Sequence, residues 1–584
     1  MAKRNIIVLG INDGHDAGAA LIKNGEVIAA VQEERLNNIK HFTGAPEKSV
    51  HEVFSIARVH PSEVNLIALV SYDPPGTENL ESLKTKILIK LSPLLHSDSY
   101  VKLYANHKKK HRKFELLKKI FEKLGLANTE TTIIEHQTAH AAAAYRSSPW
   151  GYNGKNKYNG GDDNILILTA DGSGDGLSST VNIGRKGGKI DRLEFSSYYD
   201  SVGNAFYTEI TRFLGLKPWE HEYKVMGLAP YGKADYCIDK MQQIIRINPN
   251  NPLRFQNTMG RVGSNLQPKL RKLLINQRFD NIAAAAQQHF ENLMKSWVSN
   301  AIRATGATKV ACAGGLFLNV KANKLLREMD DVEQIFFYPA PDDEGSPVGA
   351  ALQGYYEYCI RDGISAEHVP IARTYYGPSF SNDQIKEILL KNNNHTGKWK
   401  YDFYDDIDGT AGELLGKDKI IARCTGGAEW GPRALGNRSI IANPQGLEMI
   451  HKINFAIKQR DFWMPFAPSL LDERKDDYIV DPEFAPYMIM TFDSSKEAEE
   501  ISATVHPYDR TCRPQTLTNE WNPNYHKIIK TFESITGIGA VLNTSFNLHG
   551  YPMVGTPEIA LWTFQKSKLD HLVIGNYLIS RITS

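Results

Sequence analysis

Cysteine is scarce in this sequence, with only five among 584 residues. They are odd in number, far apart and never spaced as CxxC: Cys237, Cys312, Cys359, Cys424 and Cys512. This pattern argues against a disulfide framework and against a thiolate metal site, because both need paired cysteines. A reducing, cytoplasmic setting is therefore the simplest expectation.

Long apolar runs are missing as well. The first run, at residues 5–11, is followed by Asp13 and is much shorter than a signal-peptide core or a membrane span. No later stretch is long and apolar enough to span a bilayer. We therefore expect no membrane partner.

Neither sign of charge is in excess, since 68 Lys+Arg face 66 Asp+Glu. This balance supplies no global attraction to nucleic acid or to anionic membranes. The basic run at 106–124 carries an apolar stripe at helical spacing, which is typical of an amphipathic surface helix with a solvated basic face. Nucleic acid is therefore not an expected partner.

Two segments share one architecture. Residues 5–11 read as a buried strand, followed by the turn NDGHDAG and two apolar runs around an Asn-Gly hairpin signal. Residues 164–170 repeat this order, ending in DGSGDG before another strand pair. The repetition predicts two related halves with both Asp-Gly turns facing one cleft.

The remaining pattern predicts an α/β protein of at least two domains. A long helix is expected at 281–304. A strand, a Gly-Gly turn and a helix follow each other at 310–329, and a strand, an acidic turn and a helix follow at 335–352. A seam rich in proline and glycine lies near 366–382. We therefore place one domain at 1–365 and a second at 366–584.

The segment IIEHQTAHAAAAY at 133–145 holds two histidines one helical turn apart. His136 and His140 share a helix face, a geometry that allows two neutral imidazoles to bind one metal. Glu135 precedes the first histidine, so the HExxH pattern of zinc proteases is absent. The surrounding alanines are interpreted as leaving room for other segments to approach the histidines. The alternative is one buried core histidine and one exposed histidine.

Acidic turns could complete this site. Asp171 follows one predicted strand, and Asp342 and Asp343 follow another. Two histidines and two carboxylates form a mixed nitrogen and oxygen site that suits iron, manganese or zinc. In the first turn, His15 lies between two aspartates, where it could act as a general base or hold phosphate. The alternative for that turn is that its aspartates only cap backbone groups.

Glycine turns at 171–176 and 313–319 could bind a nucleotide. Their backbone N–H groups are unobstructed, and the second turn is followed by a predicted helix whose N-terminus attracts anions. Tight turns that need positive φ are the alternative.

Cationic and amide-bearing turns gather in the second domain. Guanidinium groups and a lysine in turns suit a small phosphorylated ligand, and solvated surface charge is the alternative. The residues concerned are Arg433, Arg438, Lys458, Arg460, Arg513, Asn543 and Ser545.

The chain also resembles a known family. INDGHDAGAALIKNG, QEERLNNIKHFTG, EHQTAHAAAAY, ADGSGDG, EYKVMGLAPYG, AGGLFLNVKAN, EWGPRALGNRS, RPQT and LNTSFN resemble, in order, the motifs of the O-carbamoyltransferases of the NodU/CmcH family. The matches run from residue 5 to about 560. The resemblance implies a duplicated ASKHA (actin/hexokinase-like) N-terminal domain similar to the metal-dependent subunit of the tRNA threonylcarbamoyl machinery, and a YrdC-like α/β C-terminal domain.

The chemistry that the resemblance implies begins with carbamoyl phosphate, which loses phosphate in the YrdC-like domain. The carbamate reacts with ATP to give carbamoyl adenylate, and the hydroxyl of a small metabolite then receives the carbamoyl group. ATP is a co-substrate, and Fe(II) or a similar divalent metal is the implied cofactor, with Mg²⁺ as a further candidate.

The resemblance also implies residue roles, which are expectations here. The implied metal ligands are His136, His140 and Asp343, with Asp342 as the alternative to Asp343. The implied catalytic residues are His15 and Asp171. The implied ATP contacts are Gly174, Gly314, Gly315 and Asn319. The implied carbamoyl-phosphate contacts are Arg433, Lys458, Arg460, Arg513, Asn543 and Ser545. Trp463 and Met464 depart from the family pattern.

Two other functions remain open from the sequence. A phosphotransferase with the same duplicated fold would leave the histidine pair and the second-domain cations without a purpose, and would produce ADP. A nucleotide-gated RNA-modification component would bind RNA in a salt-sensitive way. A homodimer is the default expectation for the assembly.

Overall fold

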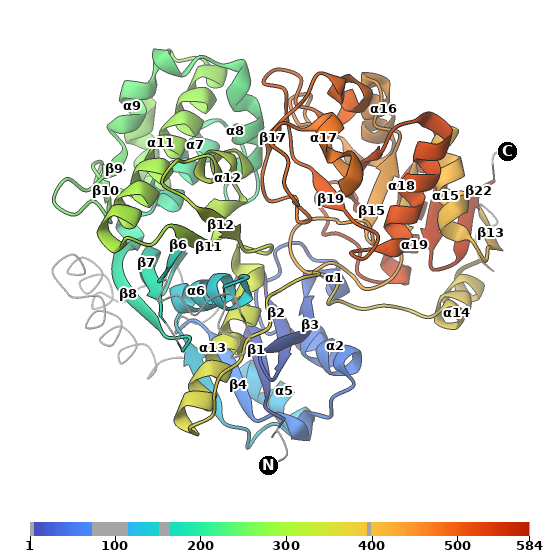
Figure 1. Cartoon of the computed structure of the whole chain (residues 1–584), viewed down its shortest axis with the longest axis horizontal. Helices are drawn as coiled ribbons and strands as arrows, with labels where there is room; N and C mark the ends of the chain where they lie inside the picture. Colours follow the sequence, from blue (N-terminus) through green and yellow to red (C-terminus); the bar gives the residue numbers. More distant parts are fainter. Residues whose placement is uncertain (1–4, 73–114, 151–163, 186, 394–398, 583–584) are drawn as a thin grey trace. The chain divides into compact units, whose positions relative to one another are not determined.

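The computed structural model describes residues 5–72, 115–150, 164–185, 187–393 and 399–582 (Figure 1). Residues 106–114 of the predicted basic helix at 106–124 lie outside these residues, and the described part contains α5, Glu115–Lys123. The chain forms two compact units. The first contains residues 1–32 and 42–372, and the second contains residues 33–41 and 373–584.

The first unit contains two five-stranded sheets with the same topology. The first sheet has the order β3-β2-β1-β4-β5, and the second has the equivalent order β8-β7-β6-β11-β12. In the first sheet β1, β2 and β3 pair antiparallel, and β4 and β5 run parallel to β1. In the second sheet β6, β7 and β8 pair antiparallel, and β11 and β12 run parallel to β6. The strands are β1 Ile7–Asn12, β2 Gly18–Lys23, β3 Glu26–Gln32, β4 Leu66–Val70, β5 Thr131–Ile134, β6 Ile165–Gly174, β7 Leu177–Gly184, β8 Ile190–Ser197, β11 Lys309–Ala313 and β12 Gln334–Phe337.

This repetition confirms the predicted duplication in the N-terminal part. The hairpin predicted at Asn-Gly is also present, because β2 and β3 pair across Asn24 and Gly25. Both residues have positive φ, at 51° and 83°, as a two-residue hairpin of this kind requires.

Two helices pack between the sheets of this unit. Helix α6, His136–Ser147, lies on β6, β7 and β11, while α13, Ser346–Arg361, lies on β1, β2 and β4 and against α6. A Cβ at Gly349 would lie 1.9 Å from the carbonyl oxygen of Ala139. The alanines of α6 therefore allow a close helix crossing. This agrees with our interpretation that the alanines leave room for another segment to approach the histidines, and that segment is α13.

A helical group packs beyond the second sheet, and α11, Phe279–Thr305, runs through it (Figure 1). This confirms the long helix predicted at 281–304. The other elements of the unit are α2 Glu47–Ala57, α7 Thr208–Phe213, α8 Glu222–Leu228, α9 Ile238–Gln242, α10 Gln267–Leu273, α12 Val320–Arg327, β9 Ile245–Ile247 and β10 Phe255–Asn257.

The second unit is built on an eight-stranded mixed sheet of order β13-β22-β21-β14-β15-β20-β16-β19, with a small β17-β18 sheet beside it. Its strands are β13 Trp399–Phe403, β14 Ile421–Cys424, β15 Ser439–Ala442, β16 Ala467–Leu471, β17 Phe492–Asp493, β18 Thr511–Cys512, β19 Gln515–Leu517, β20 Ala540–Ser545, β21 His571–Ile574 and β22 Tyr577–Arg581. Its helices are α1 Glu34–Asn37, α14 Asn382–Asn393, α15 Ile407–Gly416, α16 Leu447–Ile453, α17 Lys475–Tyr478, α18 Pro523–Thr536 and α19 Pro557–Lys566.

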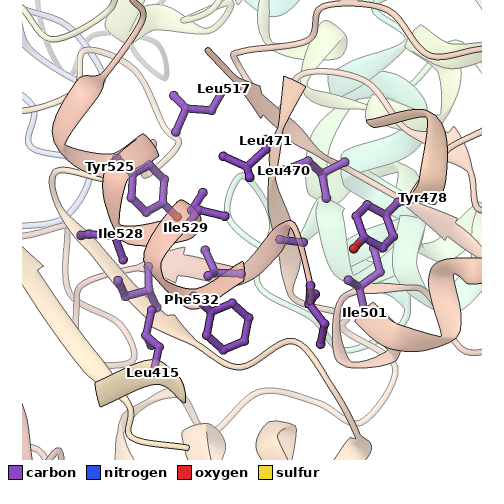
Figure 2. Close-up of a cluster of buried hydrophobic side chains, with 14 of the residues drawn as sticks. Leu415, Leu470, Leu471, Tyr478, Ile501, Leu517, Tyr525, Ile528, Ile529 and Phe532 are labelled. Atoms are coloured by element: carbon purple, nitrogen blue, oxygen red, sulfur yellow. The ribbon is translucent and has the colours of Figure 1, made fainter. Parts of the chain in front are cut away.

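Alternating residues of this sheet enter two different cores. Val541 joins a core with residues of α15 and α18 (Figure 2), whereas its neighbour Leu542 joins a core with residues of α14, α16 and α19. Successive strand residues point to opposite faces, so apolar residues at both positions bury both faces of the sheet. The sheet is therefore a buried platform for the loops at its strand ends.

The boundary between the units lies between Ala372 and Arg373, inside the predicted seam. The short segment 33–41 was not expected to leave the first unit. Arg35, 5% exposed, donates to the carbonyl oxygens of Gly431 and Met553, which anchors this segment in the second unit.

Candidate metal centre and anion site

Helix α6 begins at the first histidine. The carboxylate of Glu135 caps it by accepting hydrogen bonds from the backbone N–H groups of Gln137 and Thr138. The backbone N–H of His136 is bound by Asp175, at 2.8 Å. These contacts fix the first turn of α6, so both imidazoles have a defined direction.

Four side-chain atoms converge at this point. His136 Nε2 lies 2.9 Å from Asp171 Oδ2, 3.1 Å from His140 Nε2 and 3.3 Å from Asp343 Oδ1. His140 Nε2 lies 3.5 Å from the Asp343 oxygen and 3.8 Å from the Asp171 oxygen. Of the two candidate aspartates, the structure brings Asp343 into this group.

The spacing of these atoms suits a metal ion. Four ligands at bond lengths of about 2.0–2.1 Å around a tetrahedral ion are about 3.3–3.4 Å apart, and the distances above bracket that value. Both histidines are buried, at 6% and 1% exposure. Two imidazoles and two carboxylates are a donor set for iron, manganese or zinc, so these residues fit the implied cofactor.

The charges of the histidines and aspartates in this group depend strongly on one another. Burial opposes a charge on His136, but Asp343 and Asp171 outweigh it and raise the pKa of His136 well above its usual value. Burial would likewise raise the pKa of Asp343, yet the two histidines hold it below its usual range. A proton on His136 therefore balances the carboxylates in the metal-free chain, and a bound cation would replace that proton.

His15 lies beside a second set of acids. Its Nδ1 is 2.9 Å from Asp16 Oδ2. Burial lowers the pKa of His15, but the hydrogen bond and charge of Asp16, together with Asp343 and Asp342, raise it to about 10. In the metal-free chain His15 is therefore a cation at neutral pH, and the general-base role expected from the sequence needs its pKa to be lowered.

The predicted nucleotide residues border this site, and each makes a defined packing contact. A Cβ at Gly174 would clash with the ring of His136, and one at Gly315 would lie 2.7 Å from an Asp342 oxygen. Gly314 has a φ of 106° and packs on Ala170. These glycines are therefore required by the packing around the histidines and acids.

Asn319 is engaged in the fold rather than directed to an open space. Its side-chain oxygen caps α12 at the N–H of Ala322. Its amide also exchanges hydrogen bonds with Gln287. A side-chain contact from Asn319 to a nucleotide would require those bonds to change.

A cationic group lies in the second unit. Lys458 donates to Ser545 at 3.1 Å and to the side chain of Asn547 at 2.6 Å. Arg460 donates to Thr544 at 3.0 Å and lies over the ring of Phe466. The end of β20 thus positions two cations.

Mutual repulsion shows that the cations are close. Burial and then Arg460 lower the pKa of Lys458 well below its usual value. Burial, then Arg433 and Arg460, do the same to Arg513. Since these four cations, which come from three separate segments, repel one another, their group attracts an anion.

The loop that carries Arg433 is folded around one carboxylate. Glu429, 2% exposed, accepts hydrogen bonds from the backbone N–H groups of Leu435, Asn437 and Arg438. Arg438 itself is buried and donates to backbone carbonyls, including those of Thr425 and Pro378. The sequence placed Arg438 among the candidate ligand-binding cations. In the structure its guanidinium group instead holds the backbone of this region in place.

Asn543 lies within the sheet next to this group. Its amide nitrogen donates to the carbonyl oxygen of Ala434 and to Ser469. Its side-chain oxygen is buried without a hydrogen-bond partner among the described residues. An acceptor of this kind is available to a ligand that donates a hydrogen bond.

Several residues at these sites were missed by sequence reasoning. Thr544 and Asn547 were within the LNTSFN motif, and Asp175 was within DGSGDG, so a signal was present for each. Asp16 and Glu344 lie beside predicted residues, but only the fold reveals that they approach each other.

Among the described residues, no helix combines the length and the hydropathy that a membrane span needs.

Comparison with known proteins identifies the relatives of this chain. The family described as Carbamoyltransferase N-terminus matches residues 7–352, and Carbamoyltransferase C-terminus matches residues 412–581. An uncharacterized protein of Methanocaldococcus jannaschii is 31% identical over 99% of this chain and 100% of its own length. Nodulation protein NolNO of Sinorhizobium fredii is 30% identical over 98% of this chain and 79% of its own length.

A further relative is nodulation protein NolO of Bradyrhizobium diazoefficiens, 31% identical over 77% of this chain and 79% of its own length. The family matches cover most of both units, and the similarity to these relatives extends across them. The chain therefore belongs to the carbamoyltransferase family.

Proposed function

We propose that this protein is an ATP-dependent O-carbamoyltransferase that uses carbamoyl phosphate and modifies a hydroxyl group of a small metabolite. The convergence of His136, His140, Asp171 and Asp343 at metal-ligand spacing carries this proposal. Family membership supplies the carbamoyl chemistry, and the cationic group of the second unit supports the donor.

The cationic group supports binding of carbamoyl phosphate. Phosphate oxygens accept bidentate hydrogen bonds from guanidinium groups, which Arg433, Arg460 and Arg513 offer, and Lys458 adds a point charge. A carbamoyl NH₂ group can donate to a buried oxygen such as that of Asn543. We propose that these residues and Ser545 hold the donor while water attacks its carbonyl carbon, so that phosphate leaves and carbamate is formed.

The four-residue group of the first unit supports the transfer step. His136, His140, Asp171 and Asp343 would hold Fe(II) or a similar divalent ion, which supplies a Lewis acid for a carbonyl or phosphoryl oxygen. Carbamate and ATP would give carbamoyl adenylate and pyrophosphate, and the acceptor hydroxyl would displace AMP. The backbone of Gly174, Gly314 and Gly315 would border the nucleotide.

His15 would hold and move a proton. A positive charge bound among the neighbouring carboxylates lowers the pKa of a nearby imidazolium. The imidazole of His15 could then accept the proton of the acceptor hydroxyl. Asp16, 2.9 Å from Nδ1, orients the ring for this role.

Product analysis tests this function. The full chain is incubated with ATP, labelled carbamoyl phosphate and Fe(II), with mixed hydroxylated metabolites as acceptors. We expect AMP, pyrophosphate and a labelled carbamate ester by mass spectrometry. Formation of ADP and a phosphorylated metabolite would support the phosphotransferase alternative and contradict the proposal.

Two variants separate the partial reactions. His140→Ala should lower affinity for the divalent metal by at least about 100-fold and abolish AMP formation, while phosphate release from carbamoyl phosphate continues. Arg513→Ala should raise the KM for carbamoyl phosphate about 30- to 100-fold, equivalent to about 2–3 kcal/mol for a charge-assisted contact.

Matched controls lie nearby. His289 is also buried, at 5% exposure, and its Nε2 donates to the carbonyl oxygen of Ile245 at 2.8 Å, so His289→Gln should bind the metal as the wild type does. Arg510 pairs with Glu499, so Arg510→Ala should keep its KM. Equal loss of both partial activities in His140→Ala and Arg513→Ala would contradict the assignment of separate roles.

A further inference from the structure

A second group of acids lies in the first unit, outside the four-residue group. Asp16, Asp342 and Glu344 place their carboxylate oxygens within 4.8 Å of one another. Asp16 and Glu344 are buried, at 6% and 4% exposure. Three carboxylates this close repel one another unless protons or cations lie between them.

The fold holds these acids together from two distant segments. Asp16 belongs to the turn after β1, and the other two flank Asp343 before α13. Asn12 links the segments because its amide nitrogen donates to the carbonyl oxygens of His15, at 2.7 Å, and of Asp343, at 3.4 Å. A Cβ at Gly10 would lie 2.0 Å from the carbonyl oxygen of Pro347, so β1 and α13 pack closely and the acids cannot simply separate.

Glu344 provides an independent sign of a ligand. Its Oε1 is buried and has no hydrogen-bond partner anywhere in the described part of the chain. Buried carboxylate oxygens in native proteins are bound by donors or cations, because an unbound one loses its hydration without replacement. An ion within the acid group would satisfy this oxygen and offset the repulsion at the same time.

We propose that Asp16, Asp342 and Glu344 bind a second divalent cation, of the hard class represented by Mg²⁺. The donors are all carboxylate oxygens, which Mg²⁺, Mn²⁺ and Ca²⁺ prefer, and no imidazole or thiolate is among them. This distinguishes the group from the mixed donors around His136 and His140. Three protein ligands leave coordination positions for water or phosphate oxygens.

The second site goes beyond the proposed function, which requires only one metal. Gly315 borders both sites, because a Cβ there would lie 2.7 Å from an Asp342 oxygen and 3.1 Å from an Asp171 oxygen. Two cations would therefore sit side by side at this point. Such a pair can bind one polyphosphate from two positions.

Counting ions on the metal-free, full-length chain tests this proposal. Mn²⁺ binding is followed by electron paramagnetic resonance and by calorimetric titration. We expect two Mn²⁺ per wild-type chain and one in Glu344→Gln. His140→Ala should keep one, at the all-oxygen site. Mg²⁺ should raise the melting temperature of wild type and of His140→Ala, whereas its affinity for Glu344→Gln should fall at least about tenfold.

Two further variants guard against a folding artefact. Glu209 is a buried acid, 1% exposed, that binds Gln267 and Arg212, so Glu209→Gln should respond to Mg²⁺ as wild type does. Asp16→Asn should repeat the loss seen in Glu344→Gln. Glu344→Gln itself should melt near the wild-type temperature without metal, because glutamine keeps the size and shape of the side chain.

Two results would overturn the second site. One is an unchanged Mg²⁺ affinity in both Glu344→Gln and Asp16→Asn, which would mean that shared protons balance the acids. The other is a single Mn²⁺ in wild type that disappears in His140→Ala. Neither readout depends on carbamoyl transfer, so a failure here is distinct from a failure of the proposed function.

Discussion

Single side chains position the histidines of the first unit. Asp175 receives the backbone N–H of His136 with one oxygen and, with the other, the hydroxyl of Ser71 and the N–H of Tyr72. One carboxylate thus joins the ends of β4 and β6 to the first turn of α6. In the sequence Asp175 was visible only as part of a glycine turn, because its three contacts come from segments far away in the chain and leave no local pattern.

His368 gives the stability of this unit a defined pH dependence. It is fully buried, and its Nε2 is 3.0 Å from Arg146. Burial and the Arg146 charge lower its pKa well below the usual value. The unfolded chain binds a proton below about pH 6.5 and the folded chain does not, so stability falls as the pH falls.

We therefore expect His368→Gln to reduce this dependence. From pH 6.5 to pH 5, this residue alone should cost the wild type about 2 kcal/mol of unfolding free energy, and the variant should lack that loss. Glutamine can still accept from Arg146. Urea unfolding at pH 7.5, 6.5 and 5 measures the effect, and equal losses in both proteins would contradict it.

At the scale of elements, the packing of α6 against α13 determines where the candidate metal ligands lie. Helix α6 carries both histidines, and α13 follows Asp343 directly. Because Gly349 meets Ala139 at the crossing, the distance between the helices sets the distance between the histidines and Asp343. The alanine run predicted room for another segment, but its packing partner lies about 210 residues later in the numbering, so the identity of that partner was not predictable.

Gly349→Ala should therefore damage both stability and metal binding. The added methyl would force the helices apart, at a cost of about 1–3 kcal/mol, and move Asp343 away from the histidines. Gly306→Ala is the control, since Gly306 ends α11 at φ 70° with no atom near its Cβ position. It should cost about 1 kcal/mol and leave metal affinity unchanged. Chemical unfolding and metal titration distinguish the two.

At the scale of the whole molecule, much of the architecture was predictable. The order of strand, Asp-Gly turn and hairpin occurs twice in the sequence, so it predicted the duplicated sheets. The strand order of the second unit was not predictable, because β14 pairs with β21 about 150 residues later, and such a pairing has no local signal. Likewise, the histidine pair is visible at i and i+4, whereas the approach of Asp16 to Glu344 arises only in the folded chain.

Two compact units should unfold as two transitions in calorimetry. A divalent metal bound by the four-residue group stabilises only the unit that contains it. We expect Fe(II) or Co(II) to raise one transition temperature and leave the other unchanged, and His140→Ala to remove that shift. A shift of both transitions in wild type and variant would contradict this expectation.

Segment 33–41 affects the order in which the protein can mature. During synthesis Arg35 leaves the ribosome long before Gly431, its hydrogen-bond partner 396 residues later. Because domains fold as they emerge, the first unit can fold before the residues that bind segment 33–41 have been synthesised. A gene fragment that starts at residue 373 would encode the second unit without segment 33–41. A separate peptide of residues 33–41 would supply the missing segment.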